Sequence, residues 1–203
     1  MTSVGVVDIG LSNVDSVQRA FEVCGASVGL VTEPRDLTEY DRLVLPGVGA
    51  FGDAMRRLRS RGLDEAIREV VADGRTPLLG VCLGMQLLVD KGTEGGESPG
   101  LGVIAGEVTR IVAADRERVP HIGWNEVTPA AGSPLFEGIE PGSDFYFVHS
   151  FEVRPTPGCI ASTTPYAGGF CSAVSQGVIH GVQFHPEKSQ RNGLALMKNF
   201  LAL

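Results

Sequence analysis

A cysteine between two glycines is the first residue of this chain that could do chemistry. It lies in the stretch Gly80-Val81-Cys82-Leu83-Gly84, which has the G-x-nucleophile-x-G pattern of a nucleophile elbow. In such an elbow a strand turns sharply into a helix, and the glycines leave room for the strained turn. The N-terminus of the following helix would favour the reactive thiolate. The alternative is a small buried residue at the end of a strand, where free cysteine is common.

A histidine and a glutamate near the end of the chain could complete this chemistry. His185 and Glu187 are separated by Pro186, so in an extended backbone their side chains point the same way. The proline biases His185 towards that extended geometry. The carboxylate would keep one ring nitrogen protonated and leave the other free to accept a proton. Alone, such a pair is more often a surface contact or a helix cap, but an elbow cysteine makes it a base and an orienting group.

A glycine-rich stretch at residues 46–52, PGVGAFG, is the third candidate. It contains a formal G-x-G-x-x-G, but it does not follow the first strand, and the region about 20 residues later is helical, so dinucleotide binding is not indicated. The backbone N–H groups of Val48 and Gly49, together with that of Leu83, could instead stabilise an oxyanion. The alternative is a flexible turn between a strand and a helix.

The apolar patterns of the first half of the chain predict alternating strands and helices around these residues. Because the connections are short, this order predicts a parallel sheet with helices on both faces. Strands are expected at residues 4–8, 28–31, 42–45 and 77–81, and helices at 14–24, 50–60, 63–73 and 83–91. On the second of these helices we expect a solvent-facing arginine surface, made of Arg56, Arg57, Arg59 and Arg61.

Short strand patterns dominate the second half and predict a mixed or antiparallel extension of the sheet. They lie at residues 103–111, 122–127, 145–148, 159–163, 170–175 and 178–184. Residues 194–201 have the pattern of an amphipathic helix that packs back on the sheet. No linker interrupts the chain, so we expect a single domain over residues 1–203.

Composition excludes several classes of function. At 203 residues and 43% hydrophobic content, the chain can bury one sizeable core. Its net charge of −7 and lack of lysine and arginine blocks argue against nucleic-acid and anionic-membrane partners. No apolar run approaches the roughly 20 residues of a membrane span, and a signal peptide is not expected. Its four cysteines lack C-x-x-C spacing, which favours reduced thiols, a cytoplasmic location and no metal or other cofactor.

Together the three motifs resemble those of the class I glutamine amidotransferases, the Cys-His-Glu family, over nearly the whole chain. GVCLGMQLL at 80–88 and HPE at 185–187 mark the class, and PGVG at 46–49 is similar to its oxyanion loop. The resemblance implies that family's α/β, flavodoxin-like fold, with helices on both faces of a parallel or mixed sheet and an antiparallel extension. PHIGWN at 120–125 and YFVHS at 146–150 more narrowly resemble the glutaminase subunits of imidazole glycerol phosphate synthases, which act in histidine biosynthesis.

This resemblance implies a specific reaction for the candidate triad. Cys82 would attack the side-chain amide of glutamine, His185 would relay a proton to the departing ammonia, and Glu187 would orient the histidine. The γ-glutamyl thioester would then be hydrolysed to glutamate.

The resemblance also implies a set of substrate-binding residues. Gln86, one helical turn after the nucleophile, matches a position that holds glutamine, and Glu94 would contact its ammonium group. The alternatives are a solvent-facing helix residue for Gln86 and a loop charge for Glu94. The backbone segment that would grip the amino-acid end of the substrate is His149, Ser150 and Phe151.

A partner is implied as well. Members of the family pass ammonia to a separate (β/α)8-barrel cyclase subunit, which makes imidazole glycerol phosphate and aminoimidazole carboxamide ribotide. The matching interface positions here are Asn13 and Lys188, in a heterodimer. The first loop, residues 8–13, departs from the family pattern: it lacks an aromatic residue before Gly10, and Ser12 replaces a second glycine. The 93–96 loop is also less acidic than usual.

Three other functions fit parts of the sequence. The chain could be a glutaminase that serves another synthase, or a cysteine hydrolase that acts on peptides or γ-glutamyl conjugates. It could also be a binding module without catalysis on the same fold. The intact set of Cys82, His185 and Glu187 favours an enzyme, and the PHIGWN and YFVHS segments favour the first glutaminase.

Overall fold

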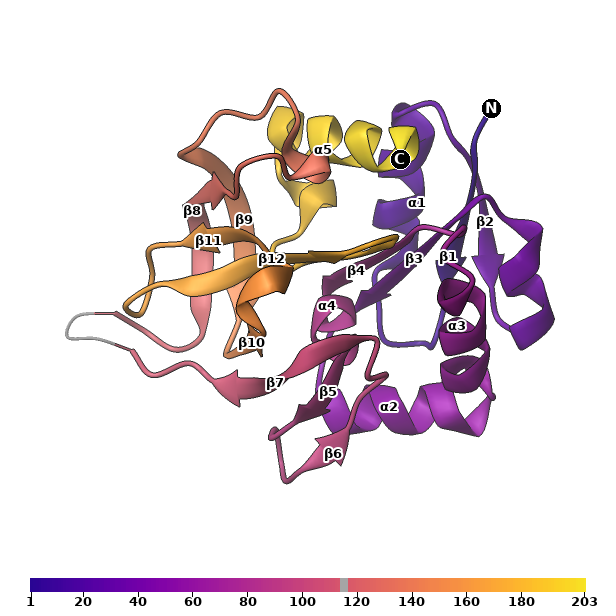
Figure 1. The fold of residues 1–203 in the computed structure, drawn as a ribbon, viewed down its shortest axis with the longest axis horizontal. Coiled ribbons are helices and arrows are strands. Elements are labelled where there is room, and N and C mark those ends of the chain that lie inside the picture. Colours follow the sequence, from indigo (N-terminus) through magenta and orange to yellow (C-terminus); the bar gives the residue numbers. More distant parts are fainter. Residues whose placement is uncertain (114–116) are drawn as a thin grey trace.

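Short runs of aliphatic residues form the parallel centre of one mixed β-sheet (Figure 1). In this computed structural model, residues 1–113 and 117–203 are described. The central strand order is β2-β1-β3-β4-β13. These strands are β1 (Ser3–Val7), β2 (Ser27–Val31), β3 (Arg42–Gly47), β4 (Leu78–Cys82) and β13 (Ile179–Val182). Every residue of β4 and β13 is buried, which explains why β4 reads as a continuous apolar run rather than an alternating one. In β13 the apolar run is interrupted by the buried His180.

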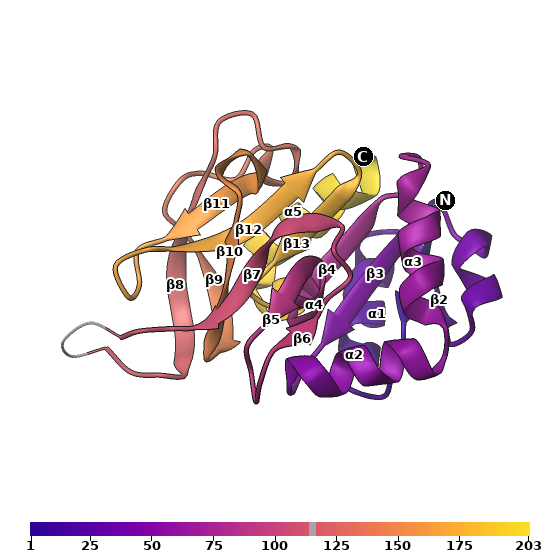
Figure 2. The same ribbon diagram turned by 60° about the horizontal axis from the view of Figure 1, so that its bottom comes forward.

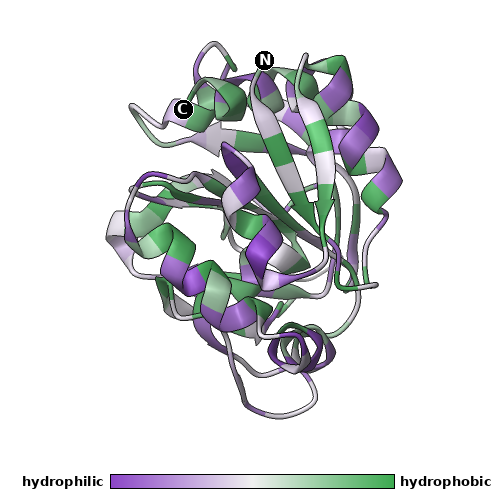
Figure 3. Ribbon diagram, turned by 90° about the vertical axis from the view of Figure 1, so that its right-hand side faces the viewer, coloured by the Kyte–Doolittle hydropathy of each residue, from purple (hydrophilic) through white to green (hydrophobic). Residues whose placement is uncertain are grey.

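Helices cover both faces of this centre, as the sequence predicted (Figure 2). One face packs against α1 (Val14–Val23) and α5 (Gln190–Ala202), and the other against α2 (Phe51–Ser60) and α3 (Leu63–Ala72). Side chains alternate between two cores: Val6 of β1 packs with α1 and α5, whereas Val7 packs with α2 and α3. Figure 3 shows the corresponding colouring, with hydrophobic strands inside and hydrophilic stripes along the outer surfaces of the helices.

The second half extends the sheet beyond β13. Most of its pairs are antiparallel, which confirms the predicted extension, although β5 and β7 pair in parallel. Four short 3-10 helices connect elements along the described chain: η1 (Pro34–Glu39), η2 (Pro134–Phe136), η3 (Pro157–Cys159) and η4 (Pro186–Lys188). The additional strands are β5 (Val89–Gly92), β6 (Ser98–Pro99), β7 (Ile104–Arg110), β8 (His121–Pro129), β9 (Ser143–His149), β10 (Phe151–Pro155), β11 (Ile160–Thr164) and β12 (Phe170–Gln176).

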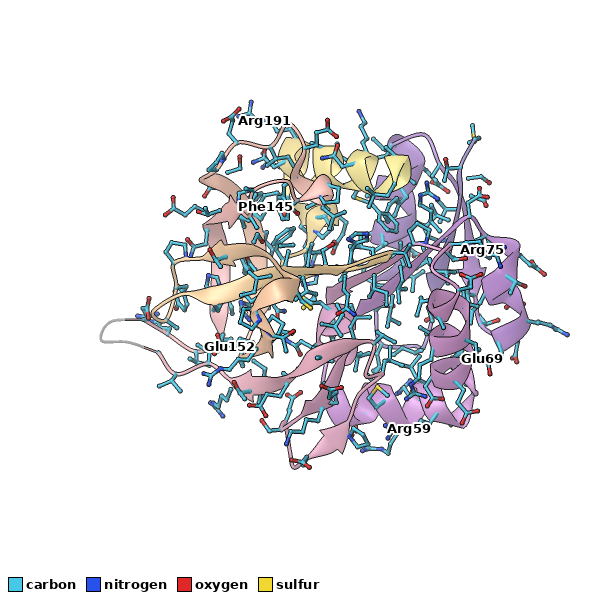
Figure 4. The ribbon with its side chains drawn as sticks, in the orientation of Figure 1. Arg59, Glu69, Arg75, Phe145, Glu152 and Arg191 are labelled. Carbon is cyan, nitrogen blue, oxygen red and sulfur yellow. The ribbon has the colours of Figure 1, made fainter. Side chains whose placement is uncertain are left out.

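Aromatic packing joins this extension to the rest of the molecule. Phe145 of β9 is fully buried, and the centre of its ring lies 4.2 Å from that of Phe184. Figure 4 shows Phe145 inside the molecule, whereas Arg59, Glu69, Arg75 and Arg191 lie at its periphery. The β8–β9 pair is therefore anchored beside the segment that carries the candidate base.

The helix predicted over residues 83–91 is wrong in its length. The observed helix, α4 (Leu83–Leu87), has five residues, and Val89 then begins strand β5, which pairs with Ile104 of β7. The apolar residues that suggested a longer helix are buried by this pairing instead. Tertiary contacts outweighed the local helical pattern. A helix this short also contributes little dipole at Cys82.

The arginines at 56–61 are exposed, as predicted, but three of them also donate hydrogen bonds to other segments. Arg57 donates through Nη1 to the carbonyl of Ile9 at 3.1 Å, and Arg61 donates to that of Asp8 at 2.8 Å. Arg59 donates to the carbonyl of Pro99 at 2.6 Å. These side chains tie the first loop and β6 to α2.

The tight approach of α4 to β3 predicts a strong effect of Gly84→Ala. A Cβ at Gly84 would lie 1.7 Å from the carbonyl oxygen of Leu45, a backbone atom that no rotamer change can move away. We expect the free energy of unfolding, measured by urea denaturation, to fall by more than about 3 kcal/mol. Gly158→Ala is the matched control, because a Cβ there meets no atom within 4 Å. Similar stability of the two variants would contradict the close packing of the elbow.

Candidate active site

Cys82 occupies a strained turn between β4 and α4. Its backbone has φ 56° and ψ −111°, a conformation that costs a residue with a Cβ about 1–3 kcal/mol and that clusters at functional sites. The turn depends on close approaches at the two glycines: a Cβ on Gly80 would lie 2.6 Å from the carbonyl oxygen of Gly84. The side chain of Cys82 lies at the end of the strand and is largely buried. This is the geometry of the nucleophile elbow that the spacing predicted.

Parallel pairing brings the candidate base to this turn. Val81 of β4 is in register with Val182 of β13, so the chain beyond β13 continues alongside Cys82. Gln183 donates through Nε2 to the sulfur of Cys82 at 3.8 Å. His185 follows two residues later, and its backbone N–H donates to the carbonyl of Tyr146 at 2.9 Å.

His185 and Glu187 form a buried pair. Nδ1 of His185 lies 2.8 Å from Oε1 of Glu187, and the two side chains are 6% and 4% exposed. η4 turns the backbone between them, and the hydroxyl of Ser189 closes the turn with a 2.6 Å hydrogen bond to the carbonyl of His185. Oε2 of Glu187 has no hydrogen-bond partner within the described part of the chain. One carboxylate oxygen is therefore committed to the histidine.

The surroundings of His185 favour its protonated form. Burial alone would lower the pKa of His185, but hydrogen bonds and charge interactions with Cys82 and Glu187 outweigh burial and raise this pKa to about 9. At neutral pH the ring is therefore an imidazolium next to the cysteine sulfur. A protonated ring in this place can hold a proton ready for a leaving group.

A hollow of about 470 Å³ opens over the cysteine. Most of the residues proposed from the sequence line it, although they come from distant segments. Glu187 lies behind His185, outside the lining, and Asn13 also lies outside it. The proposed residues that line the hollow are Val48, Gly49, Cys82, Leu83, Gln86, Glu94, His149, Ser150, Phe151, His185 and Lys188.

The glycine-rich loop is at the hollow, but one of its predicted oxyanion donors is not free. The N–H of Val48 donates to the carbonyl of Leu11 at 2.7 Å, so in this conformation it is turned away from the cysteine. The expectation that Val48 offers its N–H to an oxyanion is not met here. Gly49 has φ 101°, a value suited to glycine. Leu83 is the first residue of α4, where a backbone N–H has no partner inside the helix.

Gln86 is buried, which excludes the alternative of a solvent-facing helix residue. Its Nε2 donates to the carbonyl of Phe151 at 3.2 Å and to Oε1 of Gln183 at 3.0 Å. Gln183 was not among the predicted residues, although it precedes His185 by two positions and so points the same way in extended chain. Glu94 reaches the wall of the hollow and accepts the backbone N–H of Phe51, at the start of α2, at 2.8 Å.

The two predicted interface residues lie near one another at the surface. Asn13 caps α1 by accepting the N–H of Ser16 at 3.4 Å, and Lys188 extends over the ring of Tyr146 at 6.0 Å from its centre. Both line a small cavity of about 20 Å³ beside Glu187. No cluster of three metal-binding side chains occurs in residues 1–113 and 117–203. In the same ranges, no helix has the length and apolar character to cross a membrane.

Comparisons with known proteins agree with this geometry. The model of the family described as "Glutamine amidotransferase class-I" matches residues 5–203. A Rhodopirellula baltica protein named "Imidazole glycerol phosphate synthase subunit HisH" is 46% identical over 197 residues, 96% of this chain and 95% of that protein. A Moorella thermoacetica protein of the same name is 45% identical over 201 residues, 98% of this chain and 94% of its own length.

A solved structure supports the fold independently. The structure titled "Structure of PurLQS from Thermotoga maritima" superimposes with a TM-score of 0.77 and covers 100% of this chain and 99% of that chain. Its sequence identity is 19%, so it bears on the fold alone.

The buried pair predicts that His185 titrates well above the other histidines. We expect its ring to titrate near pH 9 in nitrogen-15 NMR, whereas His121, His149 and His180 have pKa values near 4. Because the folded pKa is raised above 6.5, the stabilisation from His185 is complete below pH 6.5 and is lost as the pH rises through about 9.

Glu187→Gln tests the cause of this shift. The amide can still accept from Nδ1 but carries no charge, so we expect the pKa of His185 to fall. Glu69→Gln is the control, because Glu69 is exposed on α3, away from the hollow. An unchanged titration in Glu187→Gln would contradict the assigned role of the carboxylate.

Proposed function

This chain belongs to the class I glutamine amidotransferase family, and we propose that it is the glutaminase subunit of an imidazole glycerol phosphate synthase. It would hydrolyse glutamine to glutamate and ammonia, and the ammonia would serve histidine biosynthesis. The observation that carries this proposal is the strained Cys82 next to the buried His185–Glu187 pair. The relatives with 45–46% identity support the choice of synthase within the family.

The first half of the reaction would form a thioester. The sulfur of Cys82, its proton passed to His185, attacks the side-chain amide carbon of glutamine and forms a tetrahedral oxyanion. The His185 imidazolium then gives its proton to the amide nitrogen, the C–N bond breaks, and ammonia leaves. Glu187 holds the ring through Nδ1 so that the other nitrogen faces the reacting atoms.

The second half would release glutamate. Water attacks the γ-glutamyl thioester carbon and gives a proton to His185, which is now neutral and acts as a base. The C–S bond then breaks, and the sulfur leaves as a thiolate next to the re-formed imidazolium. This restores the starting ion pair and needs no cofactor.

The oxyanion site would be incomplete in the conformation described above. Leu83 can supply one backbone N–H, whereas that of Val48 is bonded to Leu11. For Val48 to contribute, its peptide must rotate out of that bond, and the neighbouring Gly49 supplies the required backbone freedom. One missing oxyanion donor costs about 100- to 1,000-fold in rate, so low activity of the chain alone follows directly.

The walls of the hollow would bind the rest of the substrate. Because the amide nitrogen of Gln86 is committed to protein acceptors, the group it offers glutamine is its amide oxygen. The carboxylate of Glu94 would attract the ammonium group, and the backbone of 149–151 would grip the amino-acid end.

Ammonia would leave towards a (β/α)8-barrel cyclase subunit bound at the face that carries Asn13 and Lys188. That subunit would use it to make imidazole glycerol phosphate and aminoimidazole carboxamide ribotide. We propose that residues 1–203 act as one domain in this heterodimer, in the cytoplasm. The pairing of β4 with β13 supports the single domain, because both halves of the chain build one sheet.

Glutamate release is the direct test. We expect the isolated chain to hydrolyse glutamine weakly and the complex with a ligand-bound cyclase subunit to be at least about 100-fold faster, as expected when an oxyanion donor becomes free. Cys82→Ala should abolish activity in both states. Fast hydrolysis by the isolated chain that the cyclase subunit does not increase would refute the coupling between the two subunits. Stimulation by a different synthase subunit would show that another enzyme receives the ammonia.

Glu94 allows a paired test of substrate recognition. Glu94→Gln keeps an acceptor for the N–H of Phe51 but loses the charge, so the KM for glutamine should rise about 10- to 100-fold at unchanged thermal stability. Glu94→Ala also removes the cap of α2 and should lower the Tm in addition. An unchanged KM in Glu94→Gln would exclude an ammonium contact.

A further inference from the structure

Two buried histidines form a hydrogen-bonded chain behind the substrate hollow, and the proposed reaction does not use their side chains. His121 of β8 lies opposite His149 of β9 in the antiparallel register, and the two are 3% and 6% exposed. Nδ1 of His121 lies 2.9 Å from Nε2 of His149. Nδ1 of His149 lies 2.8 Å from the carbonyl oxygen of Phe151, and Nδ2 of Asn125 lies 3.3 Å from Nε2 of His121.

Only one arrangement of protons satisfies these contacts. A carbonyl oxygen can only accept, so Nδ1 of His149 carries a hydrogen. Burial lowers the pKa of both histidines to about 4, so both rings are neutral near pH 7. Nε2 of His149 is then an acceptor, which requires the hydrogen of His121 to be on Nδ1. Nε2 of His121 accepts in turn from the amide of Asn125.

The inner end of the chain is part of the substrate site. The carbonyl oxygen of Phe151 receives the hydrogen of His149 and also that of Gln86 Nε2, at 3.2 Å. A carbonyl oxygen has two lone pairs, so these two donors fix its direction. His149, Phe151 and Gln86 all line the hollow over Cys82. The orientation of this one carbonyl therefore couples the 149–151 backbone to Gln86.

The outer end is anchored by ring stacking. His121 is stacked between the rings of Tyr166 and Phe147, with ring centres 4.0 Å and 4.9 Å away. It also lines a second hollow of about 550 Å³ with Asn125, outside the substrate hollow. His121 does not itself line the substrate hollow, but it contacts His149, which does, so its influence on the hollow passes through His149.

We propose that His121, supported by Asn125, is a positioning residue for glutamine binding. Its hydrogen bond to Nε2 of His149 holds that ring in the orientation and tautomer whose Nδ1–H fixes the direction of the Phe151 carbonyl, and so the shape of the wall that holds the amino-acid end of glutamine. This inference rests on the proposed function for the identity of the substrate. It also gives the histidines and asparagine of the PHIGWN and YFVHS segments a physical role.

The first experiment tests the hydrogen-bonded chain of histidines without measuring enzyme activity. Nitrogen-15 NMR of the isolated protein reports which ring nitrogen carries hydrogen. We expect Nδ1–H on both His121 and His149 at pH 7, and loss of the single tautomer of His149 in His121→Phe. A wild-type His149 protonated on Nε2 would overturn the inference, whatever the protein's function.

The second experiment measures glutamine hydrolysis by the complex with the cyclase subunit. His121→Phe keeps a ring to stack on Tyr166 and Phe147 but has no nitrogen. We expect its KM for glutamine to rise about 5- to 30-fold while kcat stays within about twofold, since a binding contact and no reacting group is lost. His121→Asn retains a donor near the Nδ1 position and should restore part of the affinity.

His180→Phe is the matched control. His180 is also buried, is also neutral near pH 7, and bonds through Nδ1 to the hydroxyl of Ser175 at 2.9 Å. We expect a lower Tm and an unchanged KM. An equal rise of KM in His121→Phe and His180→Phe would reduce His121 to a structural residue and overturn the inference. A wild-type complex without glutaminase activity would instead refute the proposed function. The tautomers measured by NMR would still test the hydrogen-bonded pair of histidines.

Discussion

The parallel pairing of β4 with β13 is the contact on which the active site depends. It places Gly80 beside Gly181, and both positions leave the space that α4 occupies: a Cβ on Gly181 would lie 2.8 Å from Met85. The same register carries Cys82 and His185 to one edge of the sheet from distant parts of the chain. A slip of one residue would turn the histidine to the opposite face, because successive side chains of a strand alternate.

The glycine-rich loop after β3 and Gln86 after β4 also lie at the carboxyl ends of these parallel strands. That is where ligands bind in open α/β sheets, since the loops there converge while helices cover the faces. The extension adds the opposite wall: β9 and β10 contribute the 149–151 segment, and β8 supports it from behind. The antiparallel half of the molecule thus shapes one wall of the hollow over Cys82, and the parallel half supplies Cys82, the proposed nucleophile.

Local patterns predicted most of the elements and pointed to the residues of the candidate triad, because these patterns depend on near neighbours in the sequence. The turn at Cys82 is indicated by the glycines on either side of it, and His185 is indicated by the carboxylate of Glu187 two residues away. Contacts between segments that are far apart in the sequence could not be predicted from such local patterns. The pairing of Val89 with β7 shortened the predicted helix, and the reach of Arg57 to the first loop follows only from the packing of α2. The bond between Val48 and Leu11 likewise involves backbone atoms, which no side-chain pattern encodes.

Four carbonyl oxygens of the first loop accept hydrogen bonds from other segments. Arg57 bonds those of Ile9 and Gly10, Arg61 bonds that of Asp8, and Val48 bonds that of Leu11. Since every residue type carries the same carbonyl, these four bonds do not themselves depend on the side chains of the loop, although Ile9 is buried in the core and the carboxylate of Asp8 accepts the N–H of Gly10. The unusual sequence of residues 8–13 is therefore compatible with an unaltered loop path. Substitutions of the exposed side chains can therefore change the surface of this loop while the backbone next to the glycine-rich loop stays in place.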